Sequence, residues 1–492
     1  MTAVIRWSLL APFLLAAVVS AQDRGILDLN DLANYANQPV PTYITKDNTP
    51  ADNPLTNSGA TLGRVLFYDK NLSVDGTVAC ASCHLQQSAF SDPAQVSMGV
   101  HGATGRHSMR LINTRFAAER RFFWDERAAS LEAQATMPIQ DHAEMGFSGE
   151  QGDPPLDSLL TRMAGGEYYR RLFDFTYGDP VITEQRMQLA IAQFLRSIQS
   201  FDSRFDEGLA QTGDVAVPFP NFSERENTGK QLFLGRPVYA PGGLRISGGF
   251  GCAGCHTPPE FDIRPDSGNN GFTVRLGGGR DFDNTRVPTL RDVVDADGNV
   301  HGGLMHAGSF STLRAAIDHY ELIRIVSGNT RLDSVLVIDG RGAHLEMEGR
   351  QRQDVAAFLG TLTGSNVYAD KKWSDPFDTE GNLAVIGGAP SIPTSVATVG
   401  GATTQTFVLA PNYPNPFNPT TTITYQVAQT SVVSLRIYSV LGQRLAVPVQ
   451  GFHRPGVYRF LFDAGELPSG IYLYRLIIDG QTVETRKMLL SK

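Results

Sequence analysis

Within this 492-residue sequence, a five-residue pattern that occurs twice restricts the possible folds most strongly. Each copy has two cysteines, separated by two residues and followed directly by a histidine: Cys80, Cys83 and His84 in the first copy, and Cys252, Cys255 and His256 in the second. The chain has no other cysteine. Because residues three apart share one face of a helical turn, the thiols of each copy point the same way. The fold must therefore bring two thiols and an imidazole together at two places.

Three kinds of chemistry could use these residues. Disulfides are common in exported chains, but they leave the adjacent histidines without a purpose. One zinc ion can bind four cysteines, but these pairs lie in different parts of the sequence and the histidines would again be idle. CxxCH is also the attachment signal for c-type haem, in which the thiols bond to the porphyrin and the histidine binds the iron. The sequence therefore predicts two covalently bound haem c groups.

The N-terminal residues have the composition of a secretory signal peptide. Arg6 precedes an apolar run over residues 9–19, and small residues follow up to Ala21. The run is shorter than the about 20 residues that a membrane span needs, so we expect residues 1–21 to be a cleaved signal peptide. The net charge of −8 argues against nucleic acid as a partner. The protein is thus expected to be exported, which agrees with haem attachment outside the cytoplasm.

The remaining sequence divides by its periodicity. The segment "ITEQRMQLAIAQFLRSIQSFD" has apolar residues at helical spacing after Thr183, a good N-cap. We expect two mainly α-helical, cytochrome c-like domains, over residues 22–200 and 201–373. A Gly/Ser/Thr/Pro-rich flexible linker is expected over 374–406. Alternating apolar runs such as "TTITYQV" and "GIYLYRLIIDG" then predict a small all-β, immunoglobulin-like sandwich over 407–492.

Several motifs around the first CxxCH copy resemble one family. These are "LGRVLFYDKNLSVDGTVACASCH", "GRHSMRLINTRFAAERRFFWDERAASLEAQATMPIQDHAEMGF" and, further on, "RVPTLRDV". They are similar to the bacterial di-haem cytochrome c peroxidases and their MauG-type relatives, over about residues 50–365. The resemblance implies a peroxide-reactive haem in the N-terminal domain, at His84, and an electron-transfer haem in the C-terminal domain, at His256.

The resemblance also implies catalytic residues. Trp124 in "FFWDERA" matches the tryptophan that lies between the two haems, although Glu126 replaces the family's usual glycine. Gln134 and Glu144 match the polar residues over the first iron. A carboxylate in an apolar pocket has a raised pKa and can shuttle a proton during cleavage of hydrogen peroxide. Glu144 is therefore the acid/base candidate, with Gln134 as its support.

The sixth ligand of the second iron is implied at Tyr320, fourteen residues after His306 in "LMHAG". Peroxidases of this family usually have methionine there, and MauG-type enzymes have tyrosine. A phenolate favours ferric iron, whereas methionine raises the haem potential. His319 and Met305 are neighbouring alternatives.

Two further histidines bear on metal ligation. Some relatives cap the first haem with a distal histidine, but His101 is out of register for this, so we interpret it as a surface residue. The family's calcium-binding asparagine falls on His107, and the carbonyl positions fall near His301 and Gly303. Because calcium prefers oxygen ligands, calcium is a doubtful cofactor.

The C-terminal tail, from "LAPNYPNPFNPTTTITYQV" to the end, is similar to the sorting domains of the type IX secretion system. This implies the outer-membrane secretion machinery as a partner, and a final location in the periplasm or at the cell surface. An adhesive or carbohydrate-binding sandwich is the alternative.

Three functions agree with these features. The first is a cytochrome-c peroxidase that reduces hydrogen peroxide with electrons from a small c-type cytochrome or a cupredoxin. A second copy of the chain, in a homodimer, is a further candidate partner. The second is a MauG-like oxidase that modifies a protein substrate. The third is a surface electron-transfer cytochrome without catalysis, against which Gln134 and Glu144 argue.

Overall fold

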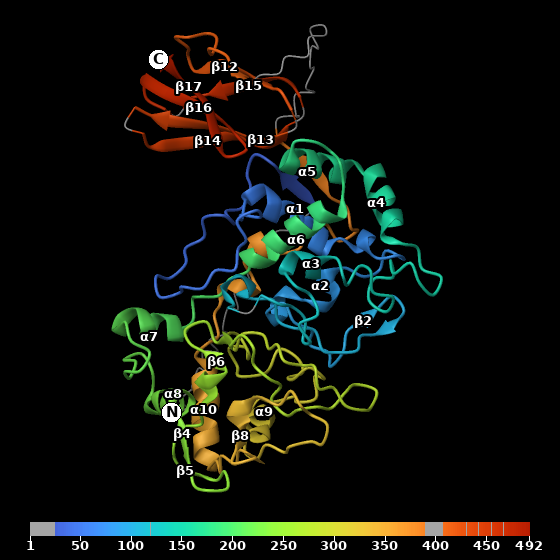
Figure 1. Cartoon of the computed structure of the whole chain (residues 1–492), viewed down its shortest axis with the longest axis vertical. Helices are drawn as coiled ribbons and strands as arrows, with labels where there is room; N and C mark the ends of the chain where they lie inside the picture. The colour runs from blue at the N-terminus through green and yellow to red at the C-terminus, as the bar shows by residue number, and fades with distance from the viewer. Residues whose placement is uncertain are drawn as a thin grey trace, which may run out of the picture.

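The computed structural model describes residues 25–388 except 119, and residues 407–492 except 430, 441, 454 and 466. Figure 1 shows three bodies, which are an N-terminal domain coloured from blue to the green of α5 and α6, a second domain coloured from green through yellow to the orange of α10, and a β-rich domain in orange and red. Each body has its own cluster of buried apolar side chains. The expected signal peptide lies outside the described residues. Within the part of the chain that is described, no helix has the length and apolar character needed to cross a membrane.

The N-terminal domain is framed by α-helices, some of which begin at side-chain caps provided by Thr56, Ser130 and Thr183. They are α1 (Asn57–Tyr68), α2 (Cys80–Cys83), α3 (Leu131–Ala135), α4 (Leu156–Gly165), α5 (Glu167–Tyr177) and α6 (Glu184–Ser197). Thr183 accepts a hydrogen bond from the backbone of Arg186, which confirms it as the N-cap of α6. α1 packs against α6 at Gly63, where a Cβ atom would lie 2.0 Å from the carbonyl oxygen of Ala190. Glycine therefore allows the two helices to touch through their backbones.

The second domain repeats this frame. Its helices are α7 (Arg204–Thr212), α8 (Glu224–Leu234), α9 (Leu313–His319) and α10 (Gly349–Gly360). α8 precedes the second CxxCH motif as α1 precedes the first, and it packs against the closing helix α10. A Cβ atom on Gly229 would lie 1.9 Å from the carbonyl oxygen of Asp354. The same device, a glycine at the helix crossing, is thus used in both haem-motif domains.

Long irregular segments join these helices, so the domains are less helical than expected. No helix or strand lies between Ile263 and Leu313 of the described chain. The strands are short hairpins: β2 (Met98–Gly99) with β3 (Gly102–Ala103), β4 (Pro237–Tyr239) with β5 (Arg245–Gly248), β6 (His256–Thr257) with β7 (Asp262–Ile263), and β8 (Val337–Ile338) with β9 (Arg341–Gly342).

The expected boundary between the second domain and the linker is wrong. Residues 366–388 return to the N-terminal domain, where β10 (Ala384–Ile386) pairs in parallel with β1 (Ile26–Asp28). Trp373 is only 1% exposed and belongs to the N-terminal core, together with Phe377. The polar, glycine-rich composition of this segment resembles a linker, but its few apolar residues anchor it. The part of the predicted linker from 389 to 406 lies outside the described residues.

The β-rich domain consists of two antiparallel sheets. One contains β11 (Val408–Leu409), β12 (Thr420–Val427) and β15 (Gly456–Asp463), and the other contains β13 (Ser431–Ser439), β14 (Arg444–His453), β16 (Gly470–Ile478) and β17 (Gln481–Leu490). Fully buried residues from both sheets, such as Ile423 and Leu435, share one core. The all-β expectation is met, and the immunoglobulin-like topology stays a prediction.

Two candidate haem sites

The first CxxCH motif forms a single helical turn whose histidine is oriented by the backbone. The Cys80–Cys83 turn is α2, and His84 follows it directly. Ala89 and Phe90 have φ of 54° and 58°, and this left-handed bend brings the Phe90 carbonyl oxygen to 3.0 Å from His84 Nδ1. Since a carbonyl can only accept, Nδ1 carries the proton and Nε2 is left with its lone pair. This is the tautomer that binds a metal through Nε2.

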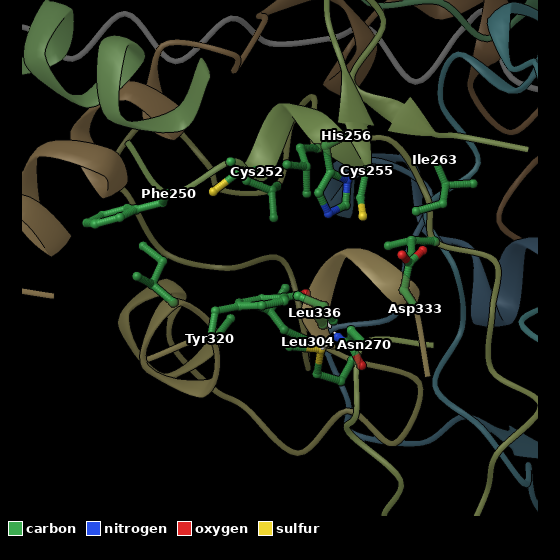
Figure 2. Close-up of a pocket in the computed structure, with 18 of the residues that line it drawn as sticks. Phe250, Cys252, Cys255, His256, Ile263, Asn270, Leu304, Tyr320, Asp333 and Leu336 are labelled. Carbon is green, nitrogen blue, oxygen red and sulfur yellow. Dashed lines mark hydrogen bonds between the residues drawn. The ribbon is translucent and has the colours of Figure 1, made fainter. Parts of the chain in front are cut away.

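The second motif opens onto a large cavity of about 830 Å³. Figure 2 shows Cys252, Cys255 and His256 on one wall and Tyr320 and Leu304 on the opposite wall. The lining is mainly apolar, and the volume falls in the range of cofactor pockets. The buried Nδ1 of His256 has no well-formed hydrogen bond among the described residues, although the Phe261 carbonyl is close enough to act on its pKa. Burial is the main reason why the pKa of His256 falls to about 4.

One amide holds both candidate ligands opposite His256. Asn270 Nδ2 donates to the Tyr320 hydroxyl at 3.0 Å and to Met305 Sδ at 3.3 Å, and all three residues line the cavity. Met305 has a φ of 66°, which is strained for a residue with a Cβ. His319 instead lines a separate surface pocket, and its Nε2 lies 2.9 Å from the Asn270 carbonyl. Of the three candidates, Tyr320 and Met305 share the cavity with the second motif and His319 does not.

Glu144 faces the first motif. Burial raises the pKa of the Cys80 thiol to about 12 and that of Cys83 to about 11, and the negative charge of Glu144 contributes to both increases. The half-buried Glu144 carboxyl itself makes no hydrogen bond or ion pair with any described residue. Burial, reinforced by Asp141, raises its pKa to about 7, against the opposing charge of Arg127. A carboxyl of this kind can both hold and release a proton near neutral pH.

Gln134 and Trp124 are placed differently from each other. Gln134 lies on α3 and is half-buried, and its side chain makes no hydrogen bond to Glu144 or to another described residue. Trp124 is 9% exposed and lines the cavity of the second motif. Its Nε1 donates to the His107 carbonyl at 2.8 Å, and its ring packs edge-on against His306 with centroids 6.3 Å apart.

Trp124 therefore lies at the boundary between the two domains. The His107 amide donates to the His306 carbonyl at 2.8 Å across this boundary. Arg106 adds an ion pair to Asp281 at 2.8 Å. These contacts hold the domains together around the indole.

Comparison with known proteins identifies the family. A family model described as "Di-haem cytochrome c peroxidase" matches residues 57–214, and one described as "Secretion system C-terminal sorting domain" matches residues 412–491. The chain is 30% identical over 329 residues to the methylamine utilization protein MauG of Methylorubrum extorquens, covering 64% of this chain and 80% of the relative. This chain is a member of the di-haem cytochrome c peroxidase and MauG family.

Both branches of the family are represented among its relatives. The cytochrome c551 peroxidase of Nitrosomonas europaea is 26% identical over 318 residues, covering 62% of this chain and 80% of the relative. A crystal structure described as a MauG-like protein associated with microbial copper homeostasis superimposes with a TM-score of 0.54 at 26% identity, covering 69% of this chain and 99% of that one. The resemblance expected from the motifs is confirmed, and the match to the sorting domain shows that the chain is exported.

Membership of this di-haem family implies two c-type haems. The residues at both motifs fit them, since each motif supplies two thiols and a histidine. Burial raises the pKa of Tyr320, so its phenolate would form only beside a cation such as a haem iron.

Arg110, which the motif analysis did not single out, also fits a haem. This residue lines the large cavity and donates from Nη2 to the Thr289 carbonyl at 2.8 Å, but its buried Nε has no hydrogen-bond partner in the described chain. A free guanidinium donor in a cavity suits a carboxylate, such as those on the edge of a haem. No periodicity distinguishes Arg110 in "SMRLINT" from the other arginines. Asn270 was missed for the same reason, since an amide in a long loop has no pattern.

His107, at the position where the family has a calcium-binding asparagine, is not suited to bind calcium. His107 Nδ1 lies 3.0 Å from the Gln95 carbonyl and Nε2 lies 3.3 Å from Ser91 Oγ, so both ring nitrogens are bonded to protein groups. The imidazole offers calcium no oxygen. His101 is bonded to Asp153 at the surface, where we interpreted it to lie.

Proposed function

We propose that this protein is an exported di-haem peroxidase that reduces hydrogen peroxide to water with electrons from a small redox protein. The observation that carries the proposal is the difference between the two motifs. The first faces Glu144, a carboxyl without a hydrogen-bond or ion-pair partner among the described residues, and the second faces Tyr320, a side chain able to fill a coordination position. An open position is needed where peroxide binds, and a filled one suits electron transfer.

In this proposal the haem at His84 would supply an iron that binds peroxide and delivers electrons to it. Glu144 would accept the proton from the oxygen nearest His84 and return it to the far oxygen, which leaves as water. Each turnover consumes two electrons and two protons and yields two water molecules. Gln134 would orient the peroxide, and Trp124 would shorten the path of electrons across the domain boundary.

The electron donor in this proposal is a small c-type cytochrome or a cupredoxin. The sorting domain would bring the protein to the outer-membrane secretion machinery, and from there to the cell surface. A periplasmic location is the alternative.

One observation favours a second function. Tyr320 lines the second cavity with its hydroxyl held by Asn270, and the resemblance places tyrosine at this position in MauG-type enzymes. The MauG of Methylorubrum extorquens is also a close relative. The second candidate is therefore a MauG-like oxidase that uses peroxide to modify a protein substrate.

The test is turnover of peroxide with a reduced small cytochrome, measured on the holoprotein. We expect Glu144→Ala to lower the turnover rate by about 10²- to 10⁴-fold, the usual contribution of an acid/base group. The exposed Glu150 provides a matched control, because Glu150→Ala removes the same charge outside the pocket. Absorption spectra of both variants verify that the haems are retained.

Unchanged turnover in Glu144→Ala would place the peroxide site elsewhere. Slow cytochrome oxidation, combined with a long-lived oxidised form after peroxide addition, would favour the MauG-like function. If the holoprotein did not react with peroxide at all, the result would favour the third function, an electron-transfer cytochrome without catalysis.

A further inference from the structure

Three side chains of metal-binding type converge at the surface of the N-terminal domain, away from both CxxCH motifs. They are His101, in the turn between β2 and β3, His142, and Asp153. Their ligand atoms all lie within 4.8 Å of one another. The two imidazole rings stack with centroids 4.4 Å apart and planes 18° apart. No step of the proposed peroxidase reaction uses these residues.

The carboxylate of Asp153 is shared by both histidines. Oδ1 lies 3.1 Å from His101 Nε2, and Oδ2 lies 2.8 Å from His142 Nδ1. Ser148 Oγ donates to the same Oδ2 at 2.7 Å and fixes the orientation of the carboxylate. The Asp153 side chain is only 6% exposed, whereas those of His101 and His142 are 39% and 32% exposed. The trio is thus a held carboxylate beneath two imidazoles that solvent can reach.

The backbone keeps the two histidines together. The amides of Val100 and His101 donate to the carbonyls of Glu144 and Ala143, at 3.0 and 3.3 Å. Gly99 allows this contact, since a Cβ atom there would lie 2.0 Å from the Ala143 carbonyl oxygen. The hairpin and the segment that follows α3 are therefore placed before any ligand arrives, which lowers the entropy cost of binding.

We propose that His101, His142 and Asp153 form a binding site for one divalent transition cation of the zinc type. Two imidazole nitrogens and a carboxylate oxygen are a common zinc ligand set, with water in the remaining position. The observed separations of 3.1 and 2.8 Å are a few tenths of an ångström shorter than the about 3.4 Å between donors on tetrahedral zinc. Small outward movements of the partly exposed His101 and His142 side chains would lengthen both separations to accommodate the ion.

Binding replaces two hydrogen bonds by two metal–nitrogen bonds. In the free protein, each imidazole donates an N–H to Asp153. When the cation binds at these nitrogens, each neutral imidazole keeps its one proton on the other ring nitrogen, as metal-bound histidines do. The bound ion then ties the β2–β3 hairpin to the segment that leads from His142 to Glu144. The site therefore has a structural role beside the first haem motif and takes no part in the proposed reaction.

The test uses the full-length, untagged holoprotein and Zn²⁺ alone. After dialysis against micromolar zinc, elemental analysis of zinc and iron in the same sample gives the zinc bound per chain. We expect one zinc per chain in the wild type. His101→Ala, His142→Ala and Asp153→Asn each remove one ligand and should weaken binding by more than about a hundredfold, since changes to residues behind the ligands already cost 10- to 100-fold.

His344→Ala is the matched control, because His344 is another partly exposed histidine, in the second domain. It should bind zinc as the wild type does. His101 lies in a hairpin turn, so His101→Ala keeps the test valid even where His142→Ala fails to fold. Zinc release from the wild type during dialysis, or equal binding by the wild type and the three ligand variants, would overturn the proposal. In that case the trio is an ordinary pair of histidine–aspartate hydrogen bonds.

Discussion

The two CxxCH sites share a frame but differ in what surrounds it. In each domain a helix with a central glycine precedes the motif and crosses the closing helix, through Gly63 in the first and Gly229 in the second. Opposite this common frame stand different groups, Glu144 at the first motif and Tyr320 at the second. The two domains thus hold their CxxCH motifs with the same helix arrangement, and the residues in the loops opposite each motif determine the chemistry of that site.

The histidines of the two motifs also differ, in the hydrogen bonding of their Nδ1 atoms. His84 Nδ1 is bonded to the Phe90 carbonyl, whereas His256 Nδ1 has no well-formed partner in the described chain. A hydrogen bond at Nδ1 fixes the ring and raises its basicity as a ligand. The two irons are therefore expected to differ in potential because of their histidines, in addition to the groups on the opposite side.

Replacement of Tyr320 is the sharpest way to break this comparison. Tyr320→Phe removes the phenol oxygen, so under the proposed Tyr320 ligation we expect the second haem to lose its sixth ligand while the first haem is unchanged. Electron paramagnetic resonance of the ferric protein distinguishes the two irons. Tyr239→Phe is the control, since Tyr239 lines the same cavity. An unchanged spectrum in Tyr320→Phe would transfer the ligand role to Met305.

The electron path between the sites is tested at Trp124. Trp124→Phe keeps an aromatic ring but loses the Nε1 hydrogen bond to His107, and we expect electron transfer between the haems to slow by about tenfold, or about 1.4 kcal/mol. Stopped-flow absorption after rapid reduction measures this rate. Trp373→Phe loses a comparable bond, to Ser197 Oγ, in the N-terminal core and serves as the control. Equal rates in both variants would contradict a relay through Trp124.

A smaller effect is expected at Asn270. Asn270→Ala removes the hydrogen bonds to Tyr320 and Met305, each worth about 1 kcal/mol. This corresponds to a shift on the order of tens of millivolts in the potential of the second haem alone, which redox titration measures. Asn299→Ala is the control, because Asn299 is bonded to Asp295 in an exposed turn. A shift in the first haem instead would reverse the assignment of the two sites.

The smallest effect concerns acid stability. Burial and the Arg110 charge lower the pKa of His301 to about 4, against Asp295, while its Nε2 is bonded to the Tyr368 hydroxyl at 3.0 Å. Between the unfolded pKa of about 6.5 and pH 4, the unfolded chain binds this proton and the folded chain does not, so the free energy of unfolding decreases as the pH falls.

His301→Gln should therefore reduce the loss of stability between pH 7 and pH 5 by on the order of 1 kcal/mol. Urea unfolding at both pH values measures the difference. His344→Gln is the control. The same pH dependence in wild type and His301→Gln would show that His301 is protonated in the folded protein.

Sequence analysis predicted the features that are encoded by short sequence motifs. The CxxCH motifs and the helix that begins at the Thr183 cap follow from neighbouring residues. Asn270 and Arg110 could not be predicted, because their roles depend on contacts with residues such as Thr289 that lie far away in the sequence. The family resemblance suggested Glu144 and Tyr320, and the structure brings each of them to a motif.

The linker boundary was mispredicted for a related reason. Residues 374–388 have the composition of a flexible segment, and composition does not reveal that Val385 inserts into the N-terminal core. A parallel pair between strands at opposite ends of the two haem domains has no signal in either strand alone.

That parallel pair sets the order in which the chain can be completed. Ile26 pairs with Ala384 in a parallel ladder. The N-terminal domain therefore lacks its last strand until the whole second domain has been synthesised. Contacts between such distant residues form slowly. Cleavage by a protease after Gly388 would leave the β1–β10 pair intact. Cleavage before Ala384 would separate β10 from the second domain, so that only its pairing with β1 and its packing would hold it on the N-terminal domain.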